Sequence, residues 1–170
     1  DKDQKIKALE EKVEELTERL INKPQVVIVN AYKDTDLSKM SDVCYYKALK
    51  RGMNCIPELI KEAHFNPENP ENHNIHIPNI KNKYVKTWEG GHWGIKKRDI
   101  VLNDMFENGV NAIEDRLEDW NREGKKINKT LENKFSTFQI RKEEKKIQQH
   151  VKESLELLLY NEGKNINKNI

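Results

Sequence analysis

The stretch from His64 to His76, HFNPENPENHNIH, carries the side chains best suited to chemistry. Three histidines lie within these 13 residues, and asparagine and proline fill much of the rest. Histidine can bind a metal ion or transfer a proton near neutral pH, and asparagine can orient such a site or hydrogen-bond the backbone. We call this stretch the motif loop, and its candidate functional residues are His64, Asn66, Asn69, Asn72, His73 and Asn74.

Three interpretations of the motif loop are open. In a nuclease of the HNH kind, one histidine activates water, an asparagine orients the site and a second histidine binds a divalent metal. In a zinc site, His64, His73 and His76 would bind the ion, without an apparent fourth ligand. In the third interpretation, the side chains hydrogen-bond backbone groups of a Pro-rich turn. We favour the third, because no histidine or aspartate immediately precedes His64 and because a helix, not a hairpin, leads into it.

No other pattern predicts a catalytic, cofactor or metal site. The motifs GxxxxGK[ST], GxGxxG, GxSxG and HExxH do not occur. Cys44 and Cys55 form no CxxC and have no histidine at zinc-site spacing, so we expect two buried thiols in a reducing compartment. No signal peptide and no 18-residue apolar run is visible. We therefore predict a protein that is not an enzyme, needs no cofactor, is not secreted and does not enter a membrane.

The charge of +2 is nearly neutral, but the last third of the chain is basic. From Lys125 to Ile170 there are 11 Lys or Arg residues against 6 Asp or Glu residues. A basic helical face can contact nucleic-acid phosphates, although many such faces are only solvated. The candidate phosphate contacts are Lys125, Lys126, Lys129, Lys134, Arg141, Lys142, Lys145 and Lys146.

Residues 2–22 show the heptad pattern of a coiled coil. The apolar residues are spaced alternately by three and four positions, and the positions between them are almost all polar. Such a narrow stripe is typical of helix pairing rather than of a helix packed on its own domain, and this pattern of β-branched a and leucine d positions favours two parallel strands. The predicted oligomerisation residues are Ile6, Val13 and Leu20 at position a, and Leu9 and Leu16 at position d.

Two short helices are predicted after a first strand. The β-branched run of residues 25–32 predicts a buried strand, and residues 41–50 predict a helix. Gly52 supplies the left-handed residue that ends it. A second helix begins at Asn54, with Pro57 in its first turn. Helix, glycine turn and helix also form the outline of a DNA-binding helix-turn-helix, but the second helix has few basic residues, so a packed helix pair is favoured.

A β-hairpin follows the motif loop. Residues 75–80 predict an edge strand, because Pro78 cannot donate to a ladder. Gly90-Gly91 predicts a two-residue hairpin turn. The resulting register places opposite each other the pairs Trp88 and Trp93, and Lys86 and Ile95.

The rest of the chain is predicted to be helical. Residues 98–124 form one helix that Gly109 weakens, and residues 126–161 form one or two more. Residues 163–170 predict a frayed tail.

The run from Ile56 to Trp93 resembles a domain of proteins from nucleocytoplasmic large DNA viruses, such as the mimivirus and marseillevirus groups. Those proteins carry HFNPE(H/N)PENHNIYI(P/S)NI and a later NKY, which His64 to Tyr84 match except for His76 in place of tyrosine. Thr87-Trp88 and Lys33 are further departures from the pattern. The resemblance implies a viral source and an architecture with an upstream coiled coil; the family's zinc-finger-like segment does not occur here. It implies no activity.

Together these patterns predict an α+β protein. Its parts are a parallel coiled coil at residues 1–22, an HFNPENPENHN-motif domain with a small antiparallel sheet at 25–100, a helical region at 101–162 and a tail at 163–170. The predicted function is non-enzymatic: a homo-oligomer, preferably a dimer, for assembly or for binding a viral or host macromolecule, in the infected cell or the virion. Nucleic-acid binding is the alternative function, and an HNH-like nuclease is a more distant one.

Overall fold

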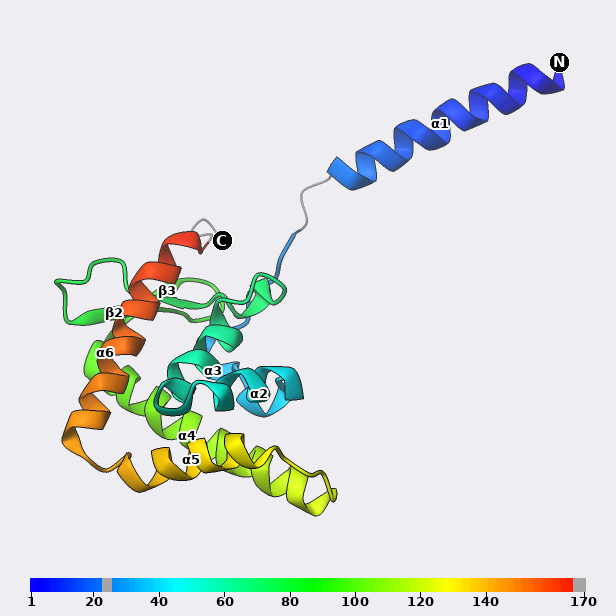
Figure 1. The fold of residues 1–170 in the computed structure, drawn as a ribbon. Helices are drawn as coiled ribbons and strands as arrows, with labels where there is room; N and C mark the ends of the chain where they lie inside the picture. The colour runs from blue at the N-terminus through cyan, green and yellow to red at the C-terminus, as the bar shows by residue number, and fades with distance from the viewer. Residues whose placement is uncertain (23–25, 167–170) are drawn as a thin grey trace.

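The computed structural model describes residues 1–22 and 26–166 and shows an α+β fold that is mostly helical (Figure 1). A small antiparallel sheet joins the helices. The helices are α1 (Lys2–Asn22), α2 (Asp42–Lys50), α3 (Cys55–His64), α4 (Arg98–Arg122), α5 (Lys129–Arg141) and α6 (Lys145–Asn161). The strands are β1 (Ile75–His76), β2 (Tyr84–Trp88) and β3 (Trp93–Lys97).

Helix α1 projects away from the other elements, which form one body (Figure 1). None of its residues is buried. The helix covers the predicted coiled-coil segment almost completely, so its apolar stripe lies in water in the isolated chain.

The sheet confirms the predicted hairpin. Its strand order is β1-β2-β3, and Trp88 pairs with Trp93 while Lys86 pairs with Ile95. The two indole rings meet edge to face with centroids 5.4 Å apart, which is a favourable aromatic geometry. Gly90 takes a φ of 94° in the turn, which a side chain would disfavour.

Strand β1 lies at one edge of the sheet, as Pro78 predicted, but it covers only Ile75–His76 of the predicted residues 75–80. The C-terminal segment covers this edge. The backbone N–H of Ile77 donates to the carbonyl of Leu159 in α6, at 3.2 Å. Gly163 packs so closely on His76 that a Cβ there would lie 2.7 Å from the His76 Cβ.

Helices α2 and α3 form the predicted pair around Gly52, whose φ is 57°. Ser41 and Asn54 hold the N-cap positions, although neither side chain makes a capping hydrogen bond. Six side chains of α3 are buried, so this helix belongs to the core. Both cysteines are free and buried, and burial raises the pKa of the Cys55 thiol to about 12.

One hydrophobic core spans the body. It joins residues of 25–100, such as Ile56, to residues of 101–162, such as Val110 and Phe138. Gly109 lies where α4 approaches α3, because a Cβ there would lie 3.0 Å from the Ile56 side chain. This close approach gives a packing reason for a glycine inside a long helix. The region after α4 contains two helices rather than one, α5 and α6.

Two further sequence predictions are wrong in part. The predicted strand 25–32 is no strand over its described residues 26–32; Val26 is 90% exposed and Tyr32 begins a 3-10 turn. β-Branched side chains favour an extended backbone, but a strand also needs a neighbour to pair with. The predicted tail is packed at its start, where Gly163 and Ile166 are buried. Residue 25 and residues 167–170 lie outside the described residues.

None of the described helices has an apolar stretch long enough to cross a membrane.

Candidate functional site

His64 is the last residue of α3 and the first of the motif loop, and it is only 3% exposed. Its Nδ1 atom lies 2.9 Å from Oδ1 of Asn74 and 3.1 Å from the carbonyl oxygen of Asn72. Both partners are acceptors, so Nδ1 must carry the proton. This assignment leaves the other ring nitrogen, Nε2, as an acceptor in the neutral imidazole.

Asn74 is fully buried and joins three segments of the chain. Its Nδ2 donates to the carbonyl of Asn30, at 3.1 Å, and to Oγ1 of Thr35, at 2.8 Å. Because the amide nitrogen has two acceptors, its oxygen must be the atom that faces His64. Asn74 therefore holds the segment around residues 30–35 against the end of α3.

The remaining motif-loop residues also bond to the chain itself. His73 Nε2 lies 2.8 Å from the carbonyl oxygen of Asn66, and Asn66 Oδ1 accepts from the backbone N–H of Glu68 at 3.0 Å. Asn72 Oδ1 accepts from the Asn30 side chain at 3.3 Å. Asn69 precedes the 3-10 turn Pro70–Asn72 and makes no capping bond with its side chain.

These contacts confirm the interpretation in which Asn and His side chains hydrogen-bond the backbone of a Pro-rich turn. The zinc interpretation needed three histidines in one place. Within residues 1–22 and 26–166, no three His, Cys, Asp or Glu side chains are grouped to hold a metal ion.

Burial lowers the pKa of His64 to about 4, because the charged imidazolium loses its hydration. The bonds to Asn72 and Asn74 favour the charged form and oppose this shift, while the charge of His73 adds to it. His64 is therefore neutral at pH 7.

A cavity of about 490 Å³ lies beside His64, between residues 32–38 and α4. Its inner wall contains Tyr32, Ile60, His64 and Met105. The Tyr32 and His64 rings are 5.5 Å apart, and burial, with the charge of Asp104, raises the pKa of Tyr32 to about 12. Three carboxylates line the same cavity: Asp34, Asp36 and Asp115.

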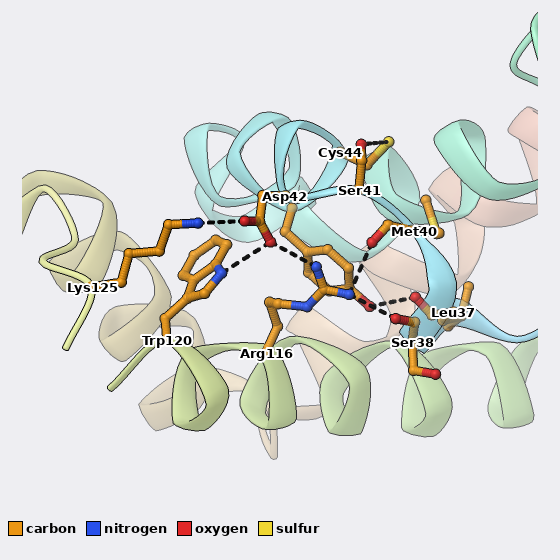
Figure 2. A network of polar contacts seen from close by, with 10 residues as sticks. Leu37, Ser38, Met40, Ser41, Asp42, Cys44, Arg116, Trp120 and Lys125 are labelled. Atoms are coloured by element: carbon orange, nitrogen blue, oxygen red, sulfur yellow. Dashed lines mark hydrogen bonds and ion pairs between the residues drawn. The ribbon is translucent and has the colours of Figure 1, made fainter. Parts of the chain in front are cut away.

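A polar network fixes residues 37–42, which continue from this wall, to α4 (Figure 2). Arg116 donates to the carbonyl oxygens of Ser38 and Met40 at 2.8 and 2.9 Å, and its guanidinium lies 4.2 Å from the centre of the Tyr45 ring. It also donates to Oδ1 of Asp42 at 2.8 Å. The guanidinium of Arg116 thus hydrogen-bonds three residues of the segment 37–42.

Asp42 completes the network from the start of α2 (Figure 2). It accepts from Trp120 Nε1 at 3.0 Å and pairs with Lys125. The bond from Lys125 is the largest cause that lowers the pKa of Asp42 to about 2, and those from Trp120 and Arg116 add to it. No sequence signal joins Asp42 to Arg116, which lies 74 positions further along the chain.

Replacement of Arg116 by lysine is expected to lower the free energy of unfolding by about 2 kcal/mol, because one ammonium cannot replace the planar fork and its ring contact. Chemical denaturation measures the change. Arg122→Lys is the matched control, since among the described residues Arg122 makes only an exposed pair with Asp119 in the same helix. Equal effects of the two substitutions would contradict the role of Arg116.

The candidate phosphate contacts fall into two groups. Four of the eight bond to the protein: Lys125 to Asp42, Lys134 to the carbonyl of Lys50, Arg141 to Glu144 and Lys142 to Glu114. The others are exposed, with no ion pair among the described residues: Lys126, Lys129, Lys145 and Lys146. Nucleic-acid contact stays a prediction. Only the lysines of the second group keep their whole charge available for phosphates.

Comparison with known proteins adds no assignment to this site. No protein-family model, no curated protein and no solved structure matches the chain.

Proposed function

We propose that this chain is a non-enzymatic assembly module, in which α1 forms a parallel two-stranded coiled coil and clusters copies of the body. The observation that carries the proposal is the exposed apolar stripe of α1. Its members are between 47% (Leu16) and 75% (Leu20) exposed. Apolar area in water costs about 25 cal/mol per Å², so covering this stripe is favourable.

A second copy of α1 fits this stripe better than the body of the same chain does. The stripe follows positions a and d alone, and the rest of the helix carries charge, including the exposed Glu15–Arg19 pair at 2.7 Å. Helices of about 20 residues are marginal alone in water and gain stability from a partner. Val13 at a with Leu9 and Leu16 at d favours two parallel strands.

The clustered body would bind a viral or host macromolecule or serve as a scaffold. The resemblance of the motif loop to domains of large DNA viruses supports an action in the infected cell or in the virion. Clustering increases the strength of weak contacts, because the second contact becomes intramolecular.

Light scattering on the intact chain tests the oligomer. We expect twice the chain mass of 20.1 kDa. Leu9→Glu should shift the protein to monomer, since it places a charge in the buried seam. Ala8→Glu, the matched control, adds the same charge at an outer position of the heptad and should leave the dimer intact. A monomeric intact chain would end the proposal, and a trimer would exclude the two-stranded form.

Crosslinking tests the orientation of the strands. Lys2 occupies a d position of the same heptad, so two Lys2→Cys chains should form a disulfide across a parallel coil under oxidising conditions. An antiparallel coil places these residues at opposite ends and gives no such crosslink. The two natural cysteines are buried in the body and do not interfere.

A further inference from the structure

His64, which lines the cavity, has an acceptor atom that the fold does not use. His64 bonds through Nδ1 alone, and Nε2 has no partner among the residues that the structure describes. The imidazole is neutral and His64 lines the cavity, so Nε2 retains a lone pair that a ligand there could use. Nε2 is not one of the buried polar atoms without a partner, so water can reach it, and a donor from a ligand would take the place of that water.

The rim of the cavity is negative. Its lining includes three carboxylates, those of Asp34, Asp36 and Asp115, but only one cation, Lys33. Asp36 accepts from the backbone N–H and the hydroxyl of Ser38 at 2.9 and 2.6 Å, and these bonds lower the pKa of its carboxyl. It is therefore charged at neutral pH. The negative charge favours a cationic ligand over an anionic one.

Charges of both signs act on the tyrosines beside the cavity. Burial is the main cause that raises the pKa of Tyr45, and the charges of Asp36 and Asp115 add to it against Arg116. Lys96, 5.8 Å from the Tyr32 ring centre, also pairs with Glu89 at 3.7 Å, which reduces its effect on the cavity.

The wall between His64 and the rim is apolar. Ile60 and Met105 are buried side chains that line it, and Leu37 and Ala112 are partly buried beside them. Such a wall suits a short alkyl chain, because covering it removes apolar surface from water. The volume of about 490 Å³ is sufficient for a small molecule.

We propose that this cavity binds a short aliphatic diamine or amino alcohol. One ammonium group lies at the carboxylates of the rim, the alkyl chain contacts Ile60 and Met105, and an N–H or O–H at the other end donates to Nε2 of His64. The proposal does not depend on the oligomer, since every group that it uses lies in one chain.

The test uses 1,4-diaminobutane and 4-aminobutan-1-ol as probes on the intact chain, with succinate as a dianion of similar length. Nitrogen NMR of the imidazoles should show a shift of the His64 Nε2 resonance on titration with either amine, with a dissociation constant of about 1 mM. Succinate should cause no shift. An unchanged Nε2 resonance at saturating amine, or an equal response to succinate, would overturn the proposal.

Two variants separate the rim from the inner acceptor. Asp115→Asn should weaken diamine binding about fivefold, whereas Glu118→Gln, exposed on the same helix outside the cavity, should not change it. His64→Asn keeps an N–H near the place of Nδ1 but removes Nε2, and should abolish the binding of both amines by calorimetry while the circular dichroism spectrum stays native. Equal affinities of the Asp115 and Glu118 variants, or full binding by a folded His64→Asn protein, would contradict the assignment.

Discussion

Replacement of Asn74 by leucine is expected to lower the free energy of unfolding by about 4 kcal/mol. The side chain is fully buried and bonds to Asn30, Thr35 and His64. Leucine has a similar volume, so the change removes the hydrogen bonds without opening a large cavity. The carbonyl of Asn30 then loses its side-chain donor, and the N–H of His64 retains only the carbonyl of Asn72. Each buried group left without a partner costs about 1–3 kcal/mol.

Chemical denaturation at pH 7, followed by tryptophan fluorescence, measures this loss. Asn69→Leu is the matched control in the same loop, because the Asn69 side chain makes no capping bond and is partly exposed. It should change stability by less than about 0.5 kcal/mol. A loss below about 1 kcal/mol for Asn74→Leu would show that water replaces these bonds.

A second large effect is expected from pH. The pKa of His64 is about 4 in the folded protein and 6.5 in an ordinary environment, so the unfolded chain binds a proton between these values and the folded chain does not. Stability from His64 is therefore fully present above pH 6.5 and falls as the pH approaches 4. The total loss is about 3 kcal/mol, with a slope approaching 1.4 kcal/mol per pH unit inside this window.

Denaturation curves between pH 7 and pH 4.5 measure the slope in the intact chain and in His64→Asn, which cannot titrate. We expect the variant to be less stable at pH 7. Its free energy of unfolding should change less steeply with pH, because it lacks the one proton that the unfolded chain binds at His64 in the middle of the window. Asp42 does not contribute here, because its pKa lies near 2. Parallel slopes of the two proteins would show that His64 titrates in the folded state as it does in the unfolded chain.

Local sequence patterns predicted the elements whose conformation depends on residues close in sequence. Gly52 marked the left-handed turn between α2 and α3, and Gly90-Gly91 set the register that joins Trp88 to Trp93. The residue types of the motif loop predicted side chains that bond the backbone. In each case the structure depends on neighbours close in sequence, which a pattern can reveal.

Contacts between distant segments could not be predicted in this way. Arg116 and Asp42 look like ordinary charges of helices until α4 crosses the start of α2. Asn74 resembles its neighbouring asparagines, and only the position of residues 30–35 makes it the buried link. The β-branched run before Ala31 predicted a strand because such residues favour an extended backbone. Its composition could not show that no neighbouring strand pairs with it. The cavity beside His64 arises from three separated segments and has no sequence signal.

The covered edge of the sheet has a consequence for solubility. An open edge strand exposes unpaired N–H and C=O groups that can pair with another chain and start aggregation. At β1, the bond from Ile77 to Leu159 and the contact of Gly163 with His76 occupy this edge. At the other edge, β3 ends in the exposed residues Lys96 and Lys97, and lysine opposes strand-to-strand addition. If α1 clusters the chains as we propose, their bodies can therefore lie beside one another without their sheets merging.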